Sequence, residues 1–389
     1  MDSMESLTNL ASARRSKLFA LLGEDIGAVI SCDLPTKNYL SGYYSMNDTY
    51  ASYLSAAVAT RDKTALVVSA ADAGPALECL GDPTLIFRYG LFYFERSADS
   101  PPVEYDTPGF KTFAEAAMAA VNAVAPKELK LGVDGRGGAD LKTLVGAARP
   151  IVDISDAVVR SRLTKLPGEL VRLRRATQLV EAGIDAIRRE FKVGMSEWEL
   201  AGLVASEMVH GGGVPEFISV TTGPRSALAD AYPTARKIQA GDIIRLDAGC
   251  VVDGYKSDMA RSFVVGEASK LITARYKAIA EGLEAELAAV RSGAKVRDVH
   301  LAAVNTTRSA GIPSYRRHHC GHGIGLSGYE YPLINEASEA VLADGMCLCV
   351  ETPFYELGWG GMMIEDTIRV TEDGFDPITT IPRQLFQLA

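Results

Sequence analysis

Histidine is scarce in this chain, with only 5 residues among 389. Long apolar runs are missing as well, and none approaches the 18 residues that a membrane-spanning helix needs. Lysine and arginine form no run, and the formal net charge is -9, so no surface that neutralises a series of phosphates is expected. We therefore expect neither a membrane nor a nucleic acid as a partner.

Cysteine is also sparse and irregularly spaced. Of the six cysteines, only Cys347 and Cys349 lie close together, and the single residue between them is too few for the usual zinc-knuckle spacing. The first residues, MDSMESLTNLASARRSKLFALL, lack the charged-then-apolar order of a secretion signal. The sequence thus predicts buried free thiols in a cytoplasmic protein.

The length and the texture of the chain predict two domains. Up to about residue 155, short apolar runs such as IGAVIS (26–31) alternate with helical stretches such as 115–125, which predicts an α/β domain over residues 1–155. From residue 156 on, four helical stretches accompany strand-like runs at 243–252, 255–265, 346–351 and 362–370. The second domain, residues 156–389, is therefore expected to pack helices on a largely antiparallel sheet.

An Asp-Gly pair at 253–254 lies between two β-prone runs and is a strong hairpin signal. A two-residue turn there places Asp247 opposite Ala260, with Asp258 two residues away on the same face and roughly 7 Å distant. Two unpaired carboxylates on a buried face repel one another and cost several kcal/mol, on the order of 3. A bound cation removes that cost, although pairing with a neighbouring lysine or arginine stays open.

Two glutamates, Glu351 in CLCVETP and Glu365 in MMIEDT, interrupt otherwise apolar runs, where an unpaired charge is least expected. His322 lies in RHHCGHGIG (317–325), among glycines that allow backbone and substrate to approach closely. Four carboxylates and one imidazole carry a formal charge that matches two divalent ions. Such an oxygen-rich set favours manganese, cobalt or iron, with zinc as the alternative.

These motifs, DAG-x8-D, GHGIG, VETP and IEDT in this order, resemble the pita-bread metalloenzyme superfamily of aminopeptidase P, prolidase, methionine aminopeptidase and creatinase. SCDLPTKNYLSGYYS resembles the start of a creatinase-type N-terminal domain, and LTKLPGELVRLRRA resembles the junction to the catalytic half. The resemblance implies an α/β N-terminal domain followed by an α+β pita-bread catalytic domain. It also implies a homodimer.

The resemblance further implies roles for individual residues. The implied metal ligands are Asp247, Asp258, His322, Glu351 and Glu365. Glu351 would also shuttle the proton of the attacking water. His318 matches a histidine that lines the substrate pocket in the aminopeptidase P branch. Alternation along an extended segment predicts that His319 turns away from His318 and His322.

Three positions depart from the pattern of the proline-specific members. Asp230 and Tyr329 stand where those members carry substrate histidines, and Met363 stands where an arginine is common. An ionised Asp230 only accepts hydrogen bonds and favours a cationic group. Arg225 could hold a carboxylate, and aromatic side chains such as Trp359 could face a cation. We expect retained metal chemistry with altered specificity.

The leading interpretation is a dinuclear metal-dependent hydrolase that cleaves a C–N bond in a short peptide, similar to Xaa-Pro aminopeptidases and dipeptidases. The first alternative is a non-peptidase of the same fold that acts on a small zwitterion, either a creatinase-like hydrolase or a dimethylsulfoniopropionate-type lyase. The second alternative is a non-catalytic binding module, which metal analysis would separate from both enzymes.

Overall fold

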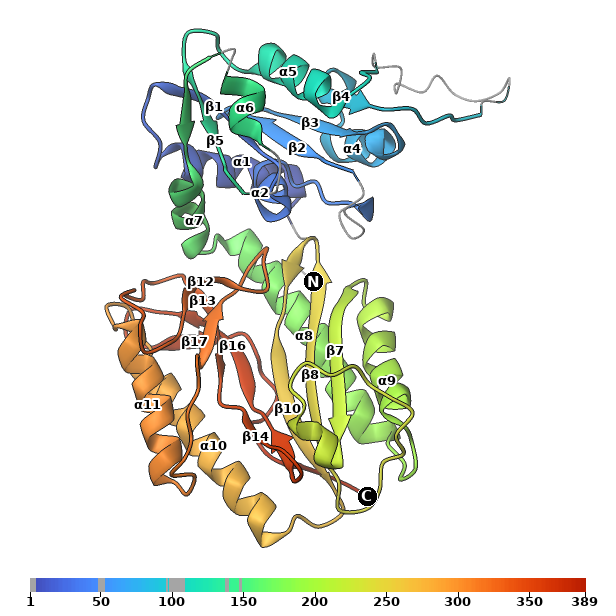
Figure 1. Cartoon of the computed structure of the whole chain (residues 1–389), viewed down its shortest axis with the longest axis vertical. Helices are drawn as coiled ribbons and strands as arrows, with labels where there is room; N and C mark the ends of the chain where they lie inside the picture. The colour runs from blue at the N-terminus through green and yellow to red at the C-terminus, as the bar shows by residue number, and fades with distance from the viewer. Residues whose placement is uncertain (1–4, 48–52, 96, 98–108, 137–139, 147–148) are drawn as a thin grey trace. The chain divides into compact units, whose positions relative to one another are not determined.

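The computed structural model describes residues 5–47, 53–95, 97, 109–136, 140–146 and 149–389. The chain divides into two compact units, residues 1–162 and 163–389, and Figure 1 shows the elements of each. Helix α7 (Ser155–Leu163) falls almost wholly in the first unit, later than the expected boundary at residue 155. The hydroxyl of Tyr39 donates a hydrogen bond to the Ser161 carbonyl, which ties the end of α7 to the first unit.

A six-stranded mixed sheet forms the centre of the first unit, in the order β4-β3-β2-β1-β5-β6. Its strands are β1 (Ile26–Ser31), β2 (Ala56–Ala59), β3 (Thr64–Ser69), β4 (Ile86–Tyr89), β5 (Lys130–Val133) and β6 (Ile151–Asp153). Strand β2 is antiparallel to both neighbours, whereas the β1–β5, β5–β6 and β3–β4 pairs are parallel. This mixture of strands and helices confirms the predicted α/β class.

Helices cover this sheet and close its apolar core. They are α1 (Leu7–Phe19), α2 (Leu34–Ser41), α4 (Ala73–Leu80), α5 (Phe113–Val124) and α6 (Leu141–Gly146), with 3-10 turns η1 (Ala70–Asp72) and η2 (Pro83–Leu85). Thr112 and Glu115 form a capping box that starts α5. Its small buried side chains, Ala116, Ala117 and Ala120, let the helix pack closely on the sheet.

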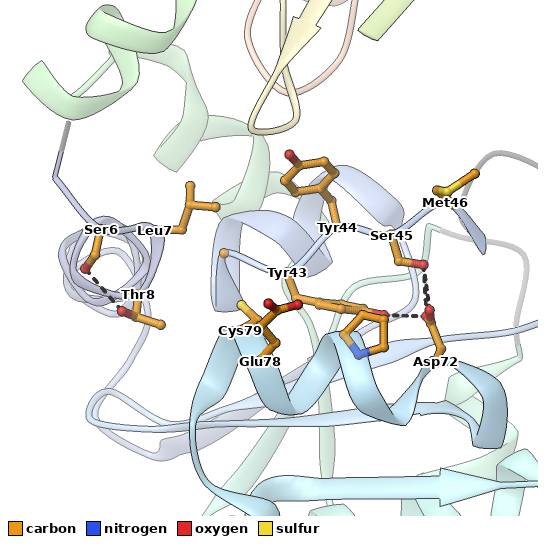
Figure 2. Close-up of a pocket in the computed structure, with 12 residues that line it drawn as sticks. Ser6, Leu7, Thr8, Tyr43, Tyr44, Ser45, Met46, Asp72, Glu78 and Cys79 are labelled. Carbon is orange, nitrogen blue, oxygen red and sulfur yellow. Dashed lines mark hydrogen bonds between the residues drawn. The ribbon is translucent and has the colours of Figure 1, made fainter. Parts of the chain in front are cut away.

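The first unit also contains an open cavity of about 590 Å³. Figure 2 shows Tyr43 and Ser45 pointing at Asp72 across this cavity. The Tyr43 hydroxyl donates to Asp72 Oδ2, and the Ser45 hydroxyl lies 2.9 Å from each carboxylate oxygen. Two hydroxyl donors therefore satisfy this half-enclosed carboxylate. The acidic residues singled out in the sequence all lie in the other unit.

A ten-stranded sheet dominates the second unit, with the path β12-β11-β13-β16-β10-β8-β7 and three further strands at its sides. Its strands are β7 (Val214–Thr222), β8 (Ile243–Val252), β9 (Tyr255–Lys256), β10 (Met259–Val265), β11 (Gly321–Gly323), β12 (Glu330–Leu333), β13 (Cys347–Glu351), β16 (Glu365–Val370), β17 (Phe375–Pro377) and β18 (Phe386–Leu388). Only the β10–β18 pair is parallel, so the sheet is largely antiparallel, as predicted. A separate ribbon joins β14 (Phe354–Glu356) to β15 (Gly360–Met362).

Two helix pairs pack against this sheet. They are α8 (Pro167–Glu190) with α9 (Glu197–His210), and α10 (Lys270–Ala289) with α11 (Val296–Ser309); the turn η3 (Gly223–Ala227) follows β7. Figure 1 shows α9 along β7 and α11 on the opposite side of the unit. Ser196 and Glu199 form the predicted capping box at the start of α9. None of the described helices is long and apolar enough to cross a membrane.

The alternation of side chains decides which residues leave the core. Leu246 and Ala248 of β8 belong to the core cluster built with α8 and α9, so Asp247 between them points to the other face. Likewise Leu348 and Val350 of β13 pack in the core with α10 and α11. Residues 349 and 351 therefore share the face that carries Asp247.

Candidate metal centre

The acidic residues form a row across four neighbouring strands. The register places Asp247 opposite Ala260, Ala260 opposite Glu365, and Glu365 opposite Glu351. This confirms the pairing of Asp247 with Ala260 that the hairpin predicted. Strands lie about 4.8 Å apart, so Asp247 and Glu365 are roughly 10 Å apart along the row. The small side chain of Ala260, which lies between them, leaves open space there.

Asp258 and His322 lie beside this row. One ligand atom each from Asp258, His322, Cys349 and Glu365 falls within 4.8 Å of the other three. His322 Nε2 lies 3.6 Å from Asp258 Oδ2. The other ring nitrogen, Nδ1, lies 3.0 Å from the carbonyl of Gly323, which fixes the ring and leaves Nε2 facing the carboxylates.

Two glycines allow His322 to reach this position. A Cβ on Gly321, whose φ is +141°, would meet the Cys349 carbonyl oxygen at 2.1 Å. A Cβ on Gly323 would meet the Tyr331 carbonyl oxygen at 2.5 Å. Strand β11 therefore fits between β13 and β12 only with glycine on both sides of His322, which confirms the predicted close approach of the backbone.

Three of the four carboxyl groups bind protons far more tightly than usual when no cation is present. Burial, followed by the charge of Asp247, raises the pKa of Asp258 well above its ordinary value. Burial and then Asp258 raise the pKa of Glu365 in the same way. Burial raises the pKa of Asp247 to about 7, although Arg245 opposes the shift. The protein groups of the cluster therefore supply too little positive charge for these carboxylates.

Hydrogen-bond donors do not supply what is missing. Asp247 Oδ1 is buried and has no partner among the described residues. Asp247 Oδ2 has one basic neighbour, Arg245 Nη1 at 3.4 Å. The oxygen and nitrogen donors, the formal charge and this orphaned oxygen together fit divalent cations.

Glu351 differs from the other three because a histidine faces it. His319 Nδ1 lies 2.8 Å from Glu351 Oε1, and the Gly321 amide nitrogen lies 3.2 Å from the same ring nitrogen. A ring nitrogen either donates or accepts, and two acceptors stay 2.8 Å apart only with a proton between them. We therefore take Nδ1 as the protonated donor to Glu351, in which case it does not accept from the Gly321 amide. Burial raises the pKa of Glu351, but the hydrogen bond and charge of His319, together with the charges of Arg317 and His322, lower the pKa below its ordinary value.

The prediction that His319 turns away from the site is wrong. Its ring lies edge-on to those of His318, 4.1 Å away, and His322, 6.2 Å away. The reason is that residues 315–320 form no strand, so the alternation assumed for an extended segment does not apply. His318 is the exposed one of the pair, and burial followed by His319 lowers its pKa.

Tyr329 covers His322 from the solvent side. The two rings stack with their centroids 3.8 Å apart and an interplanar angle of 21°. The side chain is 63% exposed, so it forms the outer wall of the cluster. Met363 is buried, and the Tyr355 hydroxyl lies 3.6 Å from its Sδ.

Two of the predicted substrate residues lie on the segment that follows β7. Asp230 is exposed, and its charge contributes to raising the pKa of Asp247. Arg225 instead donates to buried Glu197, with Nε 3.3 Å from each carboxylate oxygen, and to the Tyr232 carbonyl at 3.0 Å. Its guanidinium therefore holds this segment in place, which leaves less of it for a substrate carboxylate than predicted.

The ring face of Trp359, which was expected to meet a cation, is already occupied, as are those of Phe354 and Tyr355. The guanidinium of Arg275 lies 4.0 Å from the Trp359 ring centroid and 5.2 Å from that of Phe354. Those of Arg245 and Arg317 each lie 5.4 Å from the Tyr355 ring. Arginines of the chain itself thus cover Trp359, Phe354 and Tyr355.

Sequence reasoning missed Cys349 and Arg245. Each precedes an acidic residue of the row by two positions in the same strand, so the period of two was the available signal. Arg245 is fully buried and donates to the carbonyls of Leu228 and Ala229 as well as facing Asp247. It thereby connects the segment before Asp230 to the acidic row.

Comparisons of the sequence with known proteins agree with this geometry. Residues 171–372 match the model of metallopeptidase family M24. The Xaa-Pro dipeptidase of Pyrococcus furiosus is 30% identical over 60% of this chain and 67% of its own length. The Xaa-Pro dipeptidase of Lactobacillus helveticus is 31% identical over 60% of this chain and 64% of its own.

Solved structures share the fold over nearly the whole chain. The Xaa-Pro dipeptidase of Bacillus anthracis superimposes with a TM-score of 0.78 at 24% identity, covering 97% of this chain and 100% of the other. The N-terminal domain of the FACT complex subunit SPT16 from chickpea also matches, with a TM-score of 0.70 at 16% identity, over 98% and 99%. Because such different proteins share it, the fold alone does not assign an activity.

The family match covers the half of the chain in which the buried acidic row lies. The α/β first unit and the antiparallel second unit are the predicted pita-bread arrangement, and the solved relatives share it. The chain belongs to metallopeptidase family M24 and is a metal-dependent hydrolase of the pita-bread fold.

Proposed function

We propose that this enzyme hydrolyses the bond between an amino acid and a following proline in short peptides. One observation carries the proposal: three buried carboxylates, the partly buried Asp247 and one histidine converge on one sheet face without enough donors to neutralise them. The relatives named Xaa-Pro dipeptidase supply the substrate class. The same fold with protein donors for every one of these carboxylates would not support the proposal.

We assign two divalent cations to the centre, held by Asp247, Asp258, His322, Glu351 and Glu365. The oxygen-rich donor set favours manganese, cobalt or iron, with zinc as the alternative. When bound, the ions supply Lewis acidity to the scissile carbonyl and to the attacking water. The carboxylates themselves hold the ions and exclude competing donors from the face.

Proton transfer falls to Glu351 and His319. A carboxylate that takes the proton of the attacking water must keep a low enough pKa to be ionised, and Glu351 alone of the four has a lowered pKa. His319 Nδ1, 2.8 Å from Glu351 Oε1, orients it and stabilises its charge. His318, exposed beside His319, then contacts the substrate, as does Tyr329 at the outer wall.

Asp230 is the group that we assign to the amino end of the peptide. It is exposed, its charge acts on Asp247, and this negative charge suits an ammonium group. Met363 is apolar and buried next to Tyr355, which leaves no charge at the place where relatives of the resembled branch carry arginine. Trp359 stays a packing residue in this assignment because Arg275 covers it.

The test is turnover of Ala-Pro and Ala-Ala-Pro by protein that has been stripped of metal and reloaded with manganese, cobalt, iron or zinc. Hydrolysis of a proline peptide after reloading is the expected result. Glu351→Gln keeps the size of the side chain and removes its basicity, and it should bind metal while losing turnover by about 10²- to 10⁴-fold. Metal-loaded protein that cleaves no proline peptide would contradict the proposal.

A small zwitterion remains the second candidate, and one observation favours it. The two histidines that resemblance places around a peptide substrate are replaced by Asp230 and Tyr329; the charge of Asp230 acts on Asp247, and Tyr329 stacks on His322. Turnover of creatine-like or sulfonium zwitterions by the same metal-loaded protein, with proline peptides inert, would establish this candidate.

Assembly and location complete the proposal. We infer a homodimer from the exposed apolar run Leu91–Phe94, whose four side chains are 85%, 50%, 81% and 62% exposed. Sedimentation analysis should give twice the chain mass, and serine at Phe92 and Phe94 should weaken association. All six cysteines are unpaired, which suits the reducing cytoplasm.

A further inference from the structure

We propose that the thiol of Cys349 is a ligand of one of the two cations, together with Asp258, His322 and Glu365. The inference rests on the proposed metal centre and adds a sulfur donor to the carboxylates and the imidazole that the resemblance implies. A sulfur ligand makes one of the two positions softer than the other. Cys349 therefore sets which metal that position prefers.

The strand register brings Cys349 to the face that carries the acidic row. Cys349 of β13 pairs with His322 of β11 on one side and with Thr367 of β16 on the other. Residues directly opposite each other in a sheet point to the same face, whereas Leu348 and Val350, which flank Cys349 in its strand, pack in the core on the opposite face. The side chain of Cys349 is completely buried, so the thiol lies among the groups of the site.

The distances within this group suit a single ion. It consists of one ligand atom from each of four residues, all within 4.8 Å of one another, namely Asp258, His322, Cys349 and Glu365. Bonds of about 2.0 to 2.3 Å to a tetrahedral ion place its ligand atoms roughly 3.3 to 3.8 Å apart. His322 Nε2 already lies 3.6 Å from Asp258 Oδ2. A contraction of at most about 1 Å therefore brings all four atoms into the range for one ion.

The protein holds this thiol only weakly. Its Sγ lies 3.8 Å from the Asp258 carbonyl oxygen and 3.7 Å from the Thr367 hydroxyl. The Thr367 hydroxyl itself donates to that carbonyl at 2.9 Å, and a thiol is a weak donor by comparison. The sulfur can thus turn its lone pairs to a cation without leaving a buried acceptor unpaired.

The other cysteines of the second unit show that burial alone does not distinguish Cys349. Cys347 precedes it by two positions in β13 and is buried too, but the register pairs Cys347 with the cationic Arg369. Cys320 and Cys250 belong to the apolar core clusters. Among the cysteines that the structure describes, only Cys349 joins a group of potential metal ligands.

Coordination changes the charge of the site by one unit. The thiol proton passes to solvent as the ion binds. The thiolate adds one negative charge to the four carboxylates, and Arg245, whose Nη1 lies 3.4 Å from Asp247 Oδ2, offsets it. The formal charge of the set thus still matches two divalent ions. Thiolate favours zinc over manganese, whereas the position that is left with carboxylate oxygens stays suited to manganese.

The experiment loads metal-stripped protein with cobalt and follows its near-ultraviolet absorption. A thiolate bound to cobalt gives a charge-transfer band there that oxygen and imidazole ligands do not give. The wild type should bind two cobalt ions per chain, one of which produces the band, and Cys349→Ser should bind cobalt without it. In competition between zinc and manganese, this variant should lose about 10- to 100-fold in zinc preference, since even groups that only orient a ligand are worth that much.

Cys347→Ser is the matched control, because it removes a buried thiol from the same strand. It should keep both the band and the zinc preference. X-ray absorption of the zinc-loaded wild type needs no variant and should show one sulfur at about 2.3 Å beside the lighter ligands. A wild type with neither the band nor sulfur next to zinc would overturn the assignment. A band that survives in Cys349→Ser, or one that disappears in Cys347→Ser, would overturn it as well.

Turnover separates this inference from the proposed function, because both spectroscopic readouts measure binding alone. If sulfur is bound to the metal but the loaded protein cleaves neither Ala-Pro nor Ala-Ala-Pro, the thiolate ligand stands and the proposed reaction fails. If a proline peptide is cleaved and no sulfur is bound, the reaction stands and the ligand assignment fails.

Discussion

The two faces of strand β16 treat neighbouring carboxyl groups in opposite ways. Asp366 is buried and accepts from two guanidinium groups, Arg261 at 2.7 Å and Arg383. Glu365, the preceding residue, is equally buried but faces Glu351 across the strands and Asp258 beside it, all acidic. A buried carboxylate with a structural role accepts hydrogen bonds from donors of the protein. A buried carboxylate whose neighbours are other carboxylates requires a cation.

Glu197 shows the same distinction in another element. It is fully buried at the start of α9 and accepts from the amides and hydroxyls of Thr222 and Thr234 as well as from Arg225. Burial alone therefore does not mark the site. Missing donors combined with carboxylate neighbours do mark it: Asp366 and Glu197 have donors, whereas the members of the acidic row face one another. Glu286 of α10, which is fully buried with no donor to either oxygen among the described residues, shows that missing donors alone are not enough.

Substituting Asp366, the β16 carboxylate that has hydrogen-bond donors, should have the largest effect on stability. Asp366→Asn removes a charge that two arginines need, and Arg261 is completely buried. We expect a loss of roughly 3 to 5 kcal/mol in the free energy of unfolding, with or without metal. Denaturant unfolding measures it, and exposed Asp373→Asn serves as the control. A loss below about 1 kcal/mol would remove the contrast between the two faces.

Substituting Glu365, the β16 carboxylate without such donors, should abolish activity without lowering the free energy of unfolding. Glu365→Gln removes one negative charge from the cluster, so metal-free protein should be no less stable than the wild type. Turnover after reloading should fall by about 10³-fold, since Lewis-acid stabilisation is worth several kcal/mol. Unfolding in the presence of a chelator, next to an activity assay, tests both parts. Destabilisation as large as that of Asp366→Asn would contradict the distinction.

The space over Ala260 offers an intermediate test. Ala260→Leu fills the gap between Asp247 and Glu365 without changing any charge. Crowding of this kind costs about 1 to 3 kcal/mol, so metal affinity should fall by roughly 10- to 100-fold. Ala248→Leu, on the opposite face of β8, is the matched control for strand packing. Unchanged metal affinity in the Ala260 variant would show that no ion occupies this gap.

The outer wall should give the smallest effect. Tyr329→Ala removes the ring that stacks on His322, a contact worth about 0.5 to 1.5 kcal/mol. Metal affinity should decrease roughly two- to tenfold by the same measure, whereas Tyr329→Phe keeps the ring and should retain the affinity. An equal loss in both variants would assign the effect to the hydroxyl.

The sequence predicted those parts of the site that local rules decide. The Asp-Gly turn sets the register of β8 and β10, and the period of two then places Asp247 and Asp258 on one face. The same rules gave the helices and the largely antiparallel sheet. The predicted run 255–265 is nevertheless interrupted, because residues 257 and 258 leave the ladder between β9 and β10. Asp258, in this break, has its Oδ2 3.6 Å from His322 Nε2.

The parts that failed depend on contacts between distant residues. Arg275 covers Trp359 from α10, 84 positions earlier in the chain, and no local pattern joins them. Arg225 could be recognised as a structural residue only after Glu197 was seen facing it. His319 was misplaced because an irregular segment was read as extended.

The most direct test of the central claim is the melting temperature of metal-free and manganese-loaded protein between pH 4 and pH 8. Burial raises the pKa of Asp247 from 3.8 to about 7, and it raises the pKa values of Asp258 and Glu365 well above their ordinary values. The folded metal-free protein therefore holds protons that the unfolded chain releases, and its stability falls as the pH rises from about 4 through 7. Glu351, whose pKa is lowered, opposes this trend only in part.

Manganese should replace those protons. The account predicts that loading raises the melting temperature most above pH 7 and that the difference closes toward pH 4. Equal melting temperatures at pH 8, with the metal-free protein no less stable there than at pH 5, would contradict the claim that cations hold the acidic row together.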